Sequence, residues 1–320
     1  MYKKFIIAVL FIISFSVRLY RIDAPLADWH SFRQADTASV AREFVEKGIH
    51  LLKPRYHDLS NIQSGQSNPD GYRMVEFPLY NALHAGFYQI FGSWMSFETA
   101  GRLVSILASL TSAYFLFLIV QKETNWLTGV LTAGFFLFLP FNIYYSRTIL
   151  PGPLMVVLSL GSIYFLSISQ NSKFNIHDVS AVIFGALAML VKPYAVFLLG
   201  PAFFAKLIRN LNSKNLSRVT CYMLRVTSYL LLVAIPFIAW RKWIQQFPAG
   251  IPVNQWLLNQ NNIRLRPAWW RWLFGERLGK LILGYWGLVL FGLGLITKVK
   301  EKFSWLFYSL LAGILAYFVI

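Results

Sequence analysis

Hydrophobic and polar positions separate along this chain into long blocks. Apolar runs, some slightly short of the roughly 20 residues that cross a bilayer, alternate with short stretches that hold the charged residues. The runs predict membrane-spanning helices at 5–17, 102–120, 126–144, 152–169, 178–192, 194–208, 224–240, 279–297 and 303–320. The pattern therefore predicts an all-α polytopic membrane protein with about nine transmembrane helices.

The first apolar run could belong to a signal peptide, because Lys3 and Lys4 precede it. No small-residue cleavage pattern follows the run, however, and Arg18 and Arg21 come directly after it. We therefore expect an uncleaved first helix.

A further apolar segment, 78–92, carries polar residues such as Asn81 and Gln89. If this segment does not span, the basic loops at 206–225 and 297–302 share the side of the basic N-terminus, which the positive-inside tendency favours. We therefore predict a re-entrant or surface-lying helix and a cytoplasmic N-terminus. This topology places on the external side 21–101, 145–151, the turn near Lys192 and 241–278.

Composition supports a membrane protein. The 320 residues are 57% hydrophobic and 17% aromatic, well above an ordinary soluble domain. A formal net charge of +17 could indicate nucleic acid, but the basic residues lie in short clusters between apolar runs. We therefore expect membrane lipids, and no nucleic acid, as partners. Because Cys221 is the only cysteine, the chain has no intrachain disulfide and no cysteine-based metal site.

No internal repeat or low-complexity tract divides the chain. We expect a single transmembrane domain over 1–320, with a large first external loop at 21–101 and a second at 241–278. Since the chain stops at Ile320 within an apolar run, we expect it to lack further helices and a C-terminal domain that relatives carry.

Most titratable residues lie in the first external loop. Eight of the thirteen Asp and Glu residues and four of the five His residues lie between positions 23 and 84. A long aqueous loop collects such residues automatically, which explains Glu46, Asp58 and Asp70. It explains less well Asp28, beside the interfacial residue Trp29, and Glu76, directly before an apolar segment. Desolvation near a membrane raises a carboxyl pKa, which suits a general base.

The stretch 36–47, DTASVAREFVEK, has the apolar spacing of a short amphipathic helix on the membrane interface. Asp36 stands at the predicted start of this helix. Its side chain could cap the helix or act as a base, and capping is the interpretation that the position favours.

Several motifs together carry a resemblance. The chain has D-W-H-S-F-R-Q-A-D-T-A-x-x-A-R-x-F after its first helix, then V-E-F-P-L-Y-N, then G-R-L. This series resembles the integral-membrane GT-C glycosyltransferases, and is similar to the protein mannosyltransferase and lipid A aminoarabinose transferase group, glycosyltransferase family 39. The likeness covers roughly the first 200 residues, including YYSRTILPGPL at 144–154 and VKPYAVF at 191–197.

The resemblance implies an acidic catalytic base in the first external loop, and Asp28 is the preferred candidate. The commoner family pattern is an adjacent D-E pair. Here Asp28 is followed by Trp29 and His30, and an alignment counted back from Ala41 places Arg33-Gln34 at the pair instead. The choice between Asp28 and Asp36 therefore stays open.

The same resemblance assigns further roles. Glu76 matches an acidic residue that helps shape the acceptor and metal region, and Arg102 resembles an arginine that meets a lipid phosphate. Arg33, Arg147 and Lys192 are further candidates for phosphate contact, although Lys192 before Pro193 could equally mark a kink with a snorkelling cation. His30 and Asp28 could ligate a divalent cation, but a His two residues from an Asp is frequent by chance. We expect no obligatory cofactor and leave a divalent metal ion as the alternative.

The reaction that the resemblance implies is inverting transfer of a sugar from a polyprenyl-phosphate donor to an acceptor hydroxyl on a lipid, a glycan or a protein. An arginine would stabilise the phosphate leaving group and one carboxylate would accept the hydroxyl proton. The chain contains no D-x-D triplet and no G-x-x-x-x-G-K-[ST] loop, so neither a metal-nucleotide site nor ATP use is indicated. The expected location is a bacterial inner membrane with the active site external.

Two other classes compete with this interpretation. A flippase for lipid-linked saccharides, or another polytopic transporter, would show charged or Gly/Pro-broken positions in several central helices. A scaffold for an envelope assembly would give no reason for Asp28, Glu76 and Arg102 together at membrane level. The RPAWWRW segment at 266–272 could stack on a sugar, but an interfacial anchor of aromatic and cationic residues is the favoured interpretation.

Overall fold

The computed structural model describes residues 2–26, 30–169, 175–211, 216–253, 260–297 and 301–319. Its α-helices are α1 (Tyr2–Arg18), α2 (Ser31–Lys47), α3 (Leu79–Phe91), α4 (Phe97–Glu123), α5 (Trp126–Phe138), α6 (Pro140–Tyr145), α7 (Gly152–Ile168), α8 (Ile176–Val191), α9 (Val196–Leu211), α10 (Leu216–Trp243), α11 (Pro267–Arg271), α12 (Trp286–Ile296) and α13 (Glu301–Val319). Short 3₁₀ turns include η1 (Pro193–Ala195), and η6 (Trp272–Ile282) is a π-helix. Within the described residues no strand forms, only an isolated bridge between Arg55 and Tyr72.

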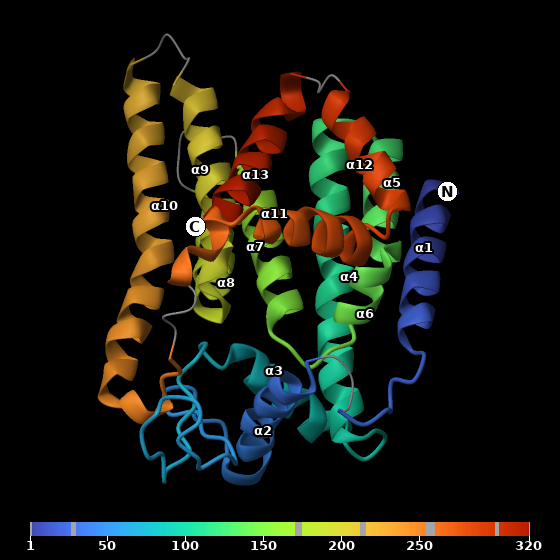
Figure 1. Ribbon diagram of the computed structural model, residues 1–320. Helices are drawn as coiled ribbons and strands as arrows, with labels where there is room; N and C mark the ends of the chain where they lie inside the picture. The colour runs from blue at the N-terminus through green and yellow to red at the C-terminus, as the bar shows by residue number, and fades with distance from the viewer. Residues whose placement is uncertain are drawn as a thin grey trace.

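The long helices form a bundle, and a smaller layer closes one end of it (Figure 1). In the bundle, α7 packs against α4 and α8, α4 against α5, α10 against α8 and α13 against α9. The end layer consists of α2, α3 and the loop between them, residues 30–92, and α3 joins it to the start of α4. The first loop thus folds into a separate polar layer on the bundle.

The expected all-α class is confirmed, while the number of spanning helices stays a prediction. Two described segments, Phe97–Glu123 and Met223–Gln246, are long and apolar enough to cross a membrane. A third is possible if Pro267–Ile282 (α11 with η6) and α12 count as one span, but this pair is bent by 111°. Most other predicted spans are present as shorter apolar helices.

Two predicted helices are broken. The run 279–297 was expected to be one helix, but the chain turns between η6 and α12, where Gly284 and Tyr285 both have positive φ. Left-handed backbone ends a right-handed helix, which is the reason for the break. The run 126–144 divides into α5 and α6 at Leu139 because Pro140 cannot donate the next helical hydrogen bond.

Both short helices predicted in the first loop are present. α3 lies beside α2 in the end layer and outside the bundle, as expected for a segment that does not span. α2 begins at Ser31, five residues before the predicted start, and buries Thr37, Ala41 and Phe44 on one face. Asp36 therefore lies inside the helix, and its predicted role as the N-cap is wrong.

The start of α4 anchors the end layer. The His84 ring stacks on Phe97 at 4.2 Å and its Nε2 lies 2.8 Å from the Phe97 carbonyl oxygen. The Tyr80 hydroxyl donates to the Gly101 carbonyl oxygen at 2.8 Å. A Cβ at Gly101 would lie 2.6 Å from the His84 ring, so only glycine permits this approach. These contacts fix α3 against the bundle.

Candidate functional site

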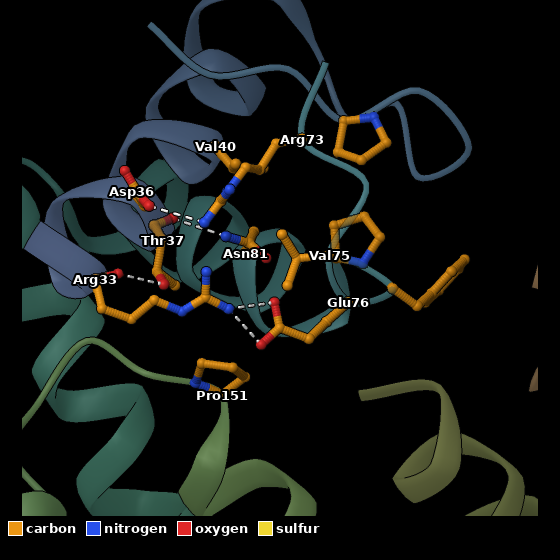
Figure 2. Close-up of a pocket in the computed structure, with 12 residues that line it drawn as sticks. Arg33, Asp36, Thr37, Val40, Arg73, Val75, Glu76, Asn81 and Pro151 are labelled. Carbon is orange, nitrogen blue, oxygen red and sulfur yellow. Dashed lines mark hydrogen bonds and ion pairs between the residues drawn. The ribbon is translucent and has the colours of Figure 1, made fainter. Parts of the chain in front are cut away.

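A hollow opens in the end layer between α2, the segment that leads into α3, and the turn before α7 (Figure 2). It is lined by Arg33, Asp36, Thr37, Val40, Pro54, Arg73, Val75, Glu76, Phe77, Pro78, Asn81 and Pro151. Three of the predicted site residues, Arg33, Asp36 and Glu76, thus meet in one place. The lining combines charged and polar side chains with apolar ones, and a few convergent polar groups in a concave site are typical of a ligand site.

Arg73 holds the Asp36 carboxylate on one wall of the hollow. Its Nη2 donates to Asp36 Oδ2 at 2.8 Å and its Nη1 to Gln63 Oε1 at 2.6 Å. The guanidinium also lies over the Tyr56 ring, 5.2 Å from the ring centroid. The side chains of Arg73 and Asp36 are only 7% and 17% exposed, so this ion pair is largely removed from water.

The environment of Asp36 changes its acidity. Burial raises the pKa of Asp36 above its ordinary value, although the charges of Arg73 and Arg33 oppose that shift. Burial also lowers the pKa of Arg73, against the influence of Asp36. A carboxylate with a raised pKa beside fixed cations can accept a proton from a bound hydroxyl group.

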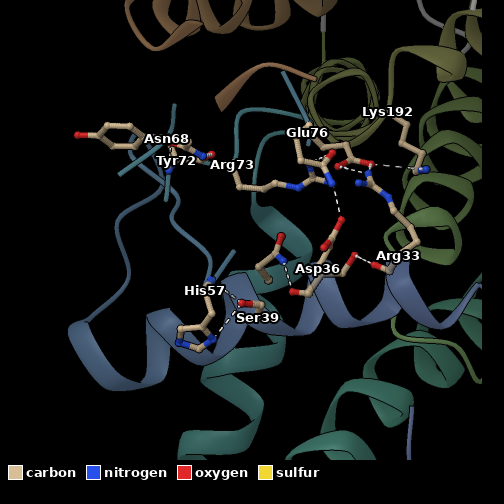
Figure 3. Close-up of polar contacts among 12 residues, drawn as sticks. Arg33, Asp36, Ser39, His57, Asn68, Tyr72, Arg73, Glu76 and Lys192 are labelled. Carbon is tan, nitrogen blue, oxygen red and sulfur yellow. Dashed lines mark hydrogen bonds and ion pairs between the residues drawn. The ribbon is translucent and has the colours of Figure 1, made fainter. Parts of the chain in front are cut away.

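On the opposite wall, two cations meet at Glu76. Arg33 Nη2 donates to both carboxylate oxygens, at 2.6 and 2.8 Å, and Lys192 Nζ lies 3.6 Å from Oε1 (Figure 3). Arg33 comes from α2, whereas Lys192 follows the last residue of α8. A backbone hydrogen bond of 3.1 Å from Phe77 N to Leu190 O joins the two segments that carry Glu76 and Lys192. The fold therefore brings together residues far apart in the chain.

The turn before α7 is fixed against the end layer. The Gln34 side-chain oxygen on α2 accepts a hydrogen bond from Ile149 N at 3.0 Å. Ser105 on α4 donates to the Thr148 carbonyl oxygen at 2.6 Å. These contacts set the position of Pro151 at the edge of the hollow.

Arg102 and Arg147 contact the chain that leaves α1. Arg102 is buried and donates to the carbonyl oxygens of Ile22 and Ala24, at 2.6 and 2.5 Å. Arg147 donates to the Tyr20 carbonyl oxygen at 2.6 Å. Both residues therefore hold the segment that leads toward α2, and phosphate contact stays a prediction for each.

The structure describes His30 but not Asp28. His30 is exposed, at the start of α2, and its ring centroid lies 6.4 Å from that of Tyr145. Asp28 lies outside the described residues, so the predicted base and its pairing with His30 in a metal site stay predictions.

Arg73 and Asn81 line the hollow but were not predicted as site residues. Asn81 lies on α3 and its Nδ2 donates to the Thr37 carbonyl oxygen of α2 at 2.7 Å, which joins the two helices beneath the hollow. The sequence offered one indication for Arg73, because this basic residue stands three positions before Glu76 in a polar loop. Only its contact with Asp36 distinguishes it from the other basic residues of the loop.

A second group of polar residues lies on the far half of α2. Glu43, Glu46 and His57 offer three possible metal-ligating atoms within 4.8 Å of one another. Glu43 already pairs with Lys47 at 2.8 Å and with His57 Nε2 at 3.0 Å. The group is thus a local network that ties the loop to α2, and it differs from the predicted Asp28 and His30 pair.

A third group lies at the other end of α8 from the hollow. The buried Asp178 carboxylate accepts hydrogen bonds from Ser169 at 2.5 Å and from Asn175 N at 2.8 Å. The side chains of Arg225 and Tyr229 on α10 donate to the same carboxylate. These contacts fasten α8 to α10 inside the bundle.

Comparison with known families and structures agrees with this fold. The family model described as dolichyl-phosphate-mannose-protein mannosyltransferase matches residues 75–240, more than half of the chain. The matched range contains Glu76 and Lys192, while α2 with Arg33 and Asp36 precedes it. A search of curated proteins finds no match.

Among solved structures, the chain is similar to the crystal structure of an oligosaccharyltransferase from Archaeoglobus fulgidus in complex with Zn and sulfate. The TM-score is 0.53 at 11% sequence identity, and the alignment covers 98% of this chain and 48% of that one. At this identity the likeness concerns the fold alone. The chain spans about half the length of that relative.

Proposed function

The chain belongs to the dolichyl-phosphate-mannose-protein mannosyltransferase family of GT-C glycosyltransferases, and we propose that it transfers a sugar from a polyprenyl-phosphate donor to an acceptor hydroxyl. The acceptor is a hydroxyl group on a lipid, a glycan or a protein. The charge pattern of the loops supports a reaction on the external face of the membrane, and we propose a bacterial inner membrane as the location.

One observation carries the proposal: the hollow combines a partly buried carboxylate with several fixed cations. Asp36 can take up a proton, while Arg33 and Lys192 can stabilise negative charge on a leaving phosphate. These are the two groups that a displacement at a sugar phosphate requires. A flippase would need cations for binding, but it would have no use for a base.

In the proposed reaction, the acceptor oxygen attacks C1 of the sugar from the face opposite the phosphate. The new C1–O bond forms as the bond from C1 to the phosphate oxygen breaks, and the electron pair leaves with the polyprenyl phosphate. The hydroxyl proton passes to the aspartate. This single displacement inverts the configuration at C1 and needs one carboxylate, unlike most glycosidases, which use two.

The base is an aspartate of the first loop. The position of Asp36 in the hollow supports Asp36, whereas the resemblance of the sequence motif supports Asp28. Arg73 beside Asp36 keeps the carboxylate oriented and favours its ionised form. We propose Asp36 as the base, with Asp28 as the alternative.

No step of the proposed reaction runs through a metal ion. The structural relative was crystallised with Zn, and the Glu43, Glu46 and His57 side chains of this chain could offer ligand atoms. These atoms pair with one another and with Lys47, on a part of α2 that does not line the hollow. A metal bound to these three side chains would join the loop to α2 and would not take part in the proposed displacement.

The test is transfer of radiolabelled sugar from polyprenyl-phosphate sugars to membrane extract. Wild-type protein is compared at matched expression with Asp36→Asn, Asp28→Asn and, as a control of equal charge change, Asp70→Asn at an exposed loop position. Loss of a general base lowers the rate by about 10²–10⁴. We expect this loss for Asp36→Asn and near wild-type transfer for Asp70→Asn.

Each outcome decides between the candidates. Loss of transfer in Asp28→Asn with activity retained in Asp36→Asn would assign the base to Asp28. If folded wild-type protein consumes no lipid-linked donor, the transferase proposal is wrong and a transporter or scaffold becomes the better interpretation.

A further inference from the structure

We propose that Glu76 is an internal counter-ion: in the unloaded protein it occupies the place on Arg33 and Lys192 that the phosphate of the lipid donor takes during the reaction. This inference rests on the proposed function and adds a role for Glu76 in donor binding. It makes Glu76 a competitor of the phosphate, so its removal should strengthen phosphate binding.

Two cations converge on the Glu76 carboxylate. Arg33 on α2 and Lys192 after α8 belong to distant parts of the chain, yet both are directed to one carboxylate (Figure 3). The two cations carry more charge than Glu76 alone can neutralise. Arg73 and Asp36 on the other wall pair with each other and leave this excess unchanged. The two cations are therefore suited to an anion that carries more negative charge than the Glu76 carboxylate.

The contacts that Arg33 and Lys192 make to Glu76 have an imperfect geometry. A single nitrogen of Arg33, Nη2, bonds both oxygens of Glu76. Arginine recognises phosphate best through two parallel N–H groups on different nitrogens, and this arrangement is not used by Glu76. The Lys192 contact of 3.6 Å is an ion pair without a hydrogen bond. Both cations can thus make stronger bonds to a phosphate than they make to Glu76.

The three side chains that meet at Glu76 are partly exposed. The side chains of Arg33, Glu76 and Lys192 are 23%, 19% and 25% exposed. Arg33 and Glu76 line the hollow, and Lys192 lies beside Glu76 outside that lining, so a ligand that takes the place of the Glu76 carboxylate can reach both cations. The backbone next to Glu76 is fixed by the hydrogen bond from Phe77 to Leu190. The carboxylate can therefore turn away by side-chain rotation while the wall of the hollow stays in place.

Competition between Glu76 and the phosphate predicts the sign of the change in phosphate affinity when Glu76 is replaced. A partly exposed ion pair is worth up to about 1 kcal/mol, so removing the competing charge should tighten phosphate binding by about three- to fivefold. A residue that only positioned Arg33 and Lys192 would give the opposite sign, because its loss would release the two cations.

The experiment measures binding of a short-chain prenyl phosphate to purified full-length protein by titration calorimetry, with inorganic phosphate as a second probe. Glu76→Gln is compared with wild type and with Asp70→Asn, which removes the same charge from an exposed position in the same loop. We expect tighter binding only for Glu76→Gln, and weaker binding for Lys192→Gln. In the double variant Glu76→Gln/Lys192→Gln, part of the gain should vanish, because the two residues interact directly.

A measurement on the wild-type protein keeps the test independent of variant folding. Bound prenyl phosphate should protect the Lys192 amine from acetylation, while the exposed Lys53 should react equally with and without ligand. Equal or weaker binding by folded Glu76→Gln overturns the inference and leaves the proposed function intact. Unchanged acetylation of Lys192 overturns the inference together with the role proposed for Lys192 at the leaving phosphate, while the proposed transfer reaction stands. If wild-type protein binds no prenyl phosphate, both the inference and the proposed function are wrong.

The two probes separate the source of the phosphate. Tightening for both probes supports recognition of the phosphate group alone. Tightening for prenyl phosphate alone supports recognition of the lipid-linked form.

Discussion

The two ends of α8 hold charged clusters of similar composition, one of them buried and the other partly exposed. Asp178 at one end is fully buried and accepts from four donors, among them the side chains of Arg225 and Tyr229. Lys192 follows the other end, about 21 Å away along the helix, where it and Arg33 both pair with Glu76 at the edge of the hollow. The side chains there remain about one-fifth exposed.

The difference shows how to distinguish a structural ion pair from a binding site. At Asp178 the carboxylate lone pairs are occupied and two helices are joined, so the cluster can accept no ligand without losing a contact. Around Glu76, two cations share one carboxylate, their side chains are partly exposed, and the Lys192 contact is longer than a hydrogen bond. These features leave room for an anion. Residue type alone does not distinguish the two clusters, because both combine acidic, basic and neutral polar side chains.

The sharpest test of the comparison is Asp178→Asn. The change leaves the Arg225 charge largely buried and without its counter-ion, which costs about 3–5 kcal/mol. We expect a large fall in the melting temperature of purified protein. Arg225→Gln added to Asp178→Asn should recover part of the loss. A melting temperature equal to wild type would contradict a structural role for this cluster.

Gly101→Ala tests the junction between the end layer and the bundle. The added Cβ would lie 2.6 Å from the buried His84 ring, and such overpacking costs about 1–3 kcal/mol. We expect lower thermal stability and reduced transfer, because α3 carries one side of the hollow. Gly86→Ala on α3 is the control, since a Cβ there meets nothing within 4 Å. Equal stability of the two variants would show that the junction adapts.

Arg73→Gln tests the electrostatics of the hollow through the pH dependence of transfer. An aspartate base works when ionised, so the rate falls as the pH falls through its pKa. Burial has already raised the pKa of Asp36, and removing Arg73 removes the largest influence that lowers it. The acid limb of the rate profile should therefore move to higher pH, with about a tenfold loss of rate on the limb for each unit moved.

Arg73→Lys keeps the charge and should leave the acid limb near its wild-type position. The comparison of the two variants separates the charge of Arg73 from its packing on Tyr56. An acid limb that does not move in Arg73→Gln would remove Asp36 as the titrating base.

The smallest effect is expected for Glu98→Gln. Its partner Arg42 is 48% exposed and 3.3 Å away, and such surface pairs contribute about 0–1 kcal/mol. Melting temperature and transfer should both stay near wild type. A large loss would indicate that exposed pairs of the end layer carry more of its stability than the comparison with Asp178 implies.

Several site residues could be predicted because their local sequence is unusual. Glu76 precedes an apolar segment, and Lys192 interrupts one, so both are marked by position. Their pairing could not be predicted, since the two residues lie 116 positions apart (192 − 76) and no periodicity links them. Arg102 illustrates the reverse: its motif suggested phosphate contact, while the fold places its guanidinium against backbone carbonyl oxygens of the chain that leaves α1.

By itself, the sequence determined the helical class, the membrane setting and the concentration of acidic residues in one loop. These properties follow from the lengths and spacing of apolar runs, which act locally along the chain. Only the tertiary structure decided that Asp36 pairs with Arg73 and does not cap α2, and that Arg33 and Lys192 meet at Glu76. Such contacts depend on how α2, the loop before α3 and the end of α8 pack together, because electrostatic interactions join groups that are close in space whatever their separation in sequence.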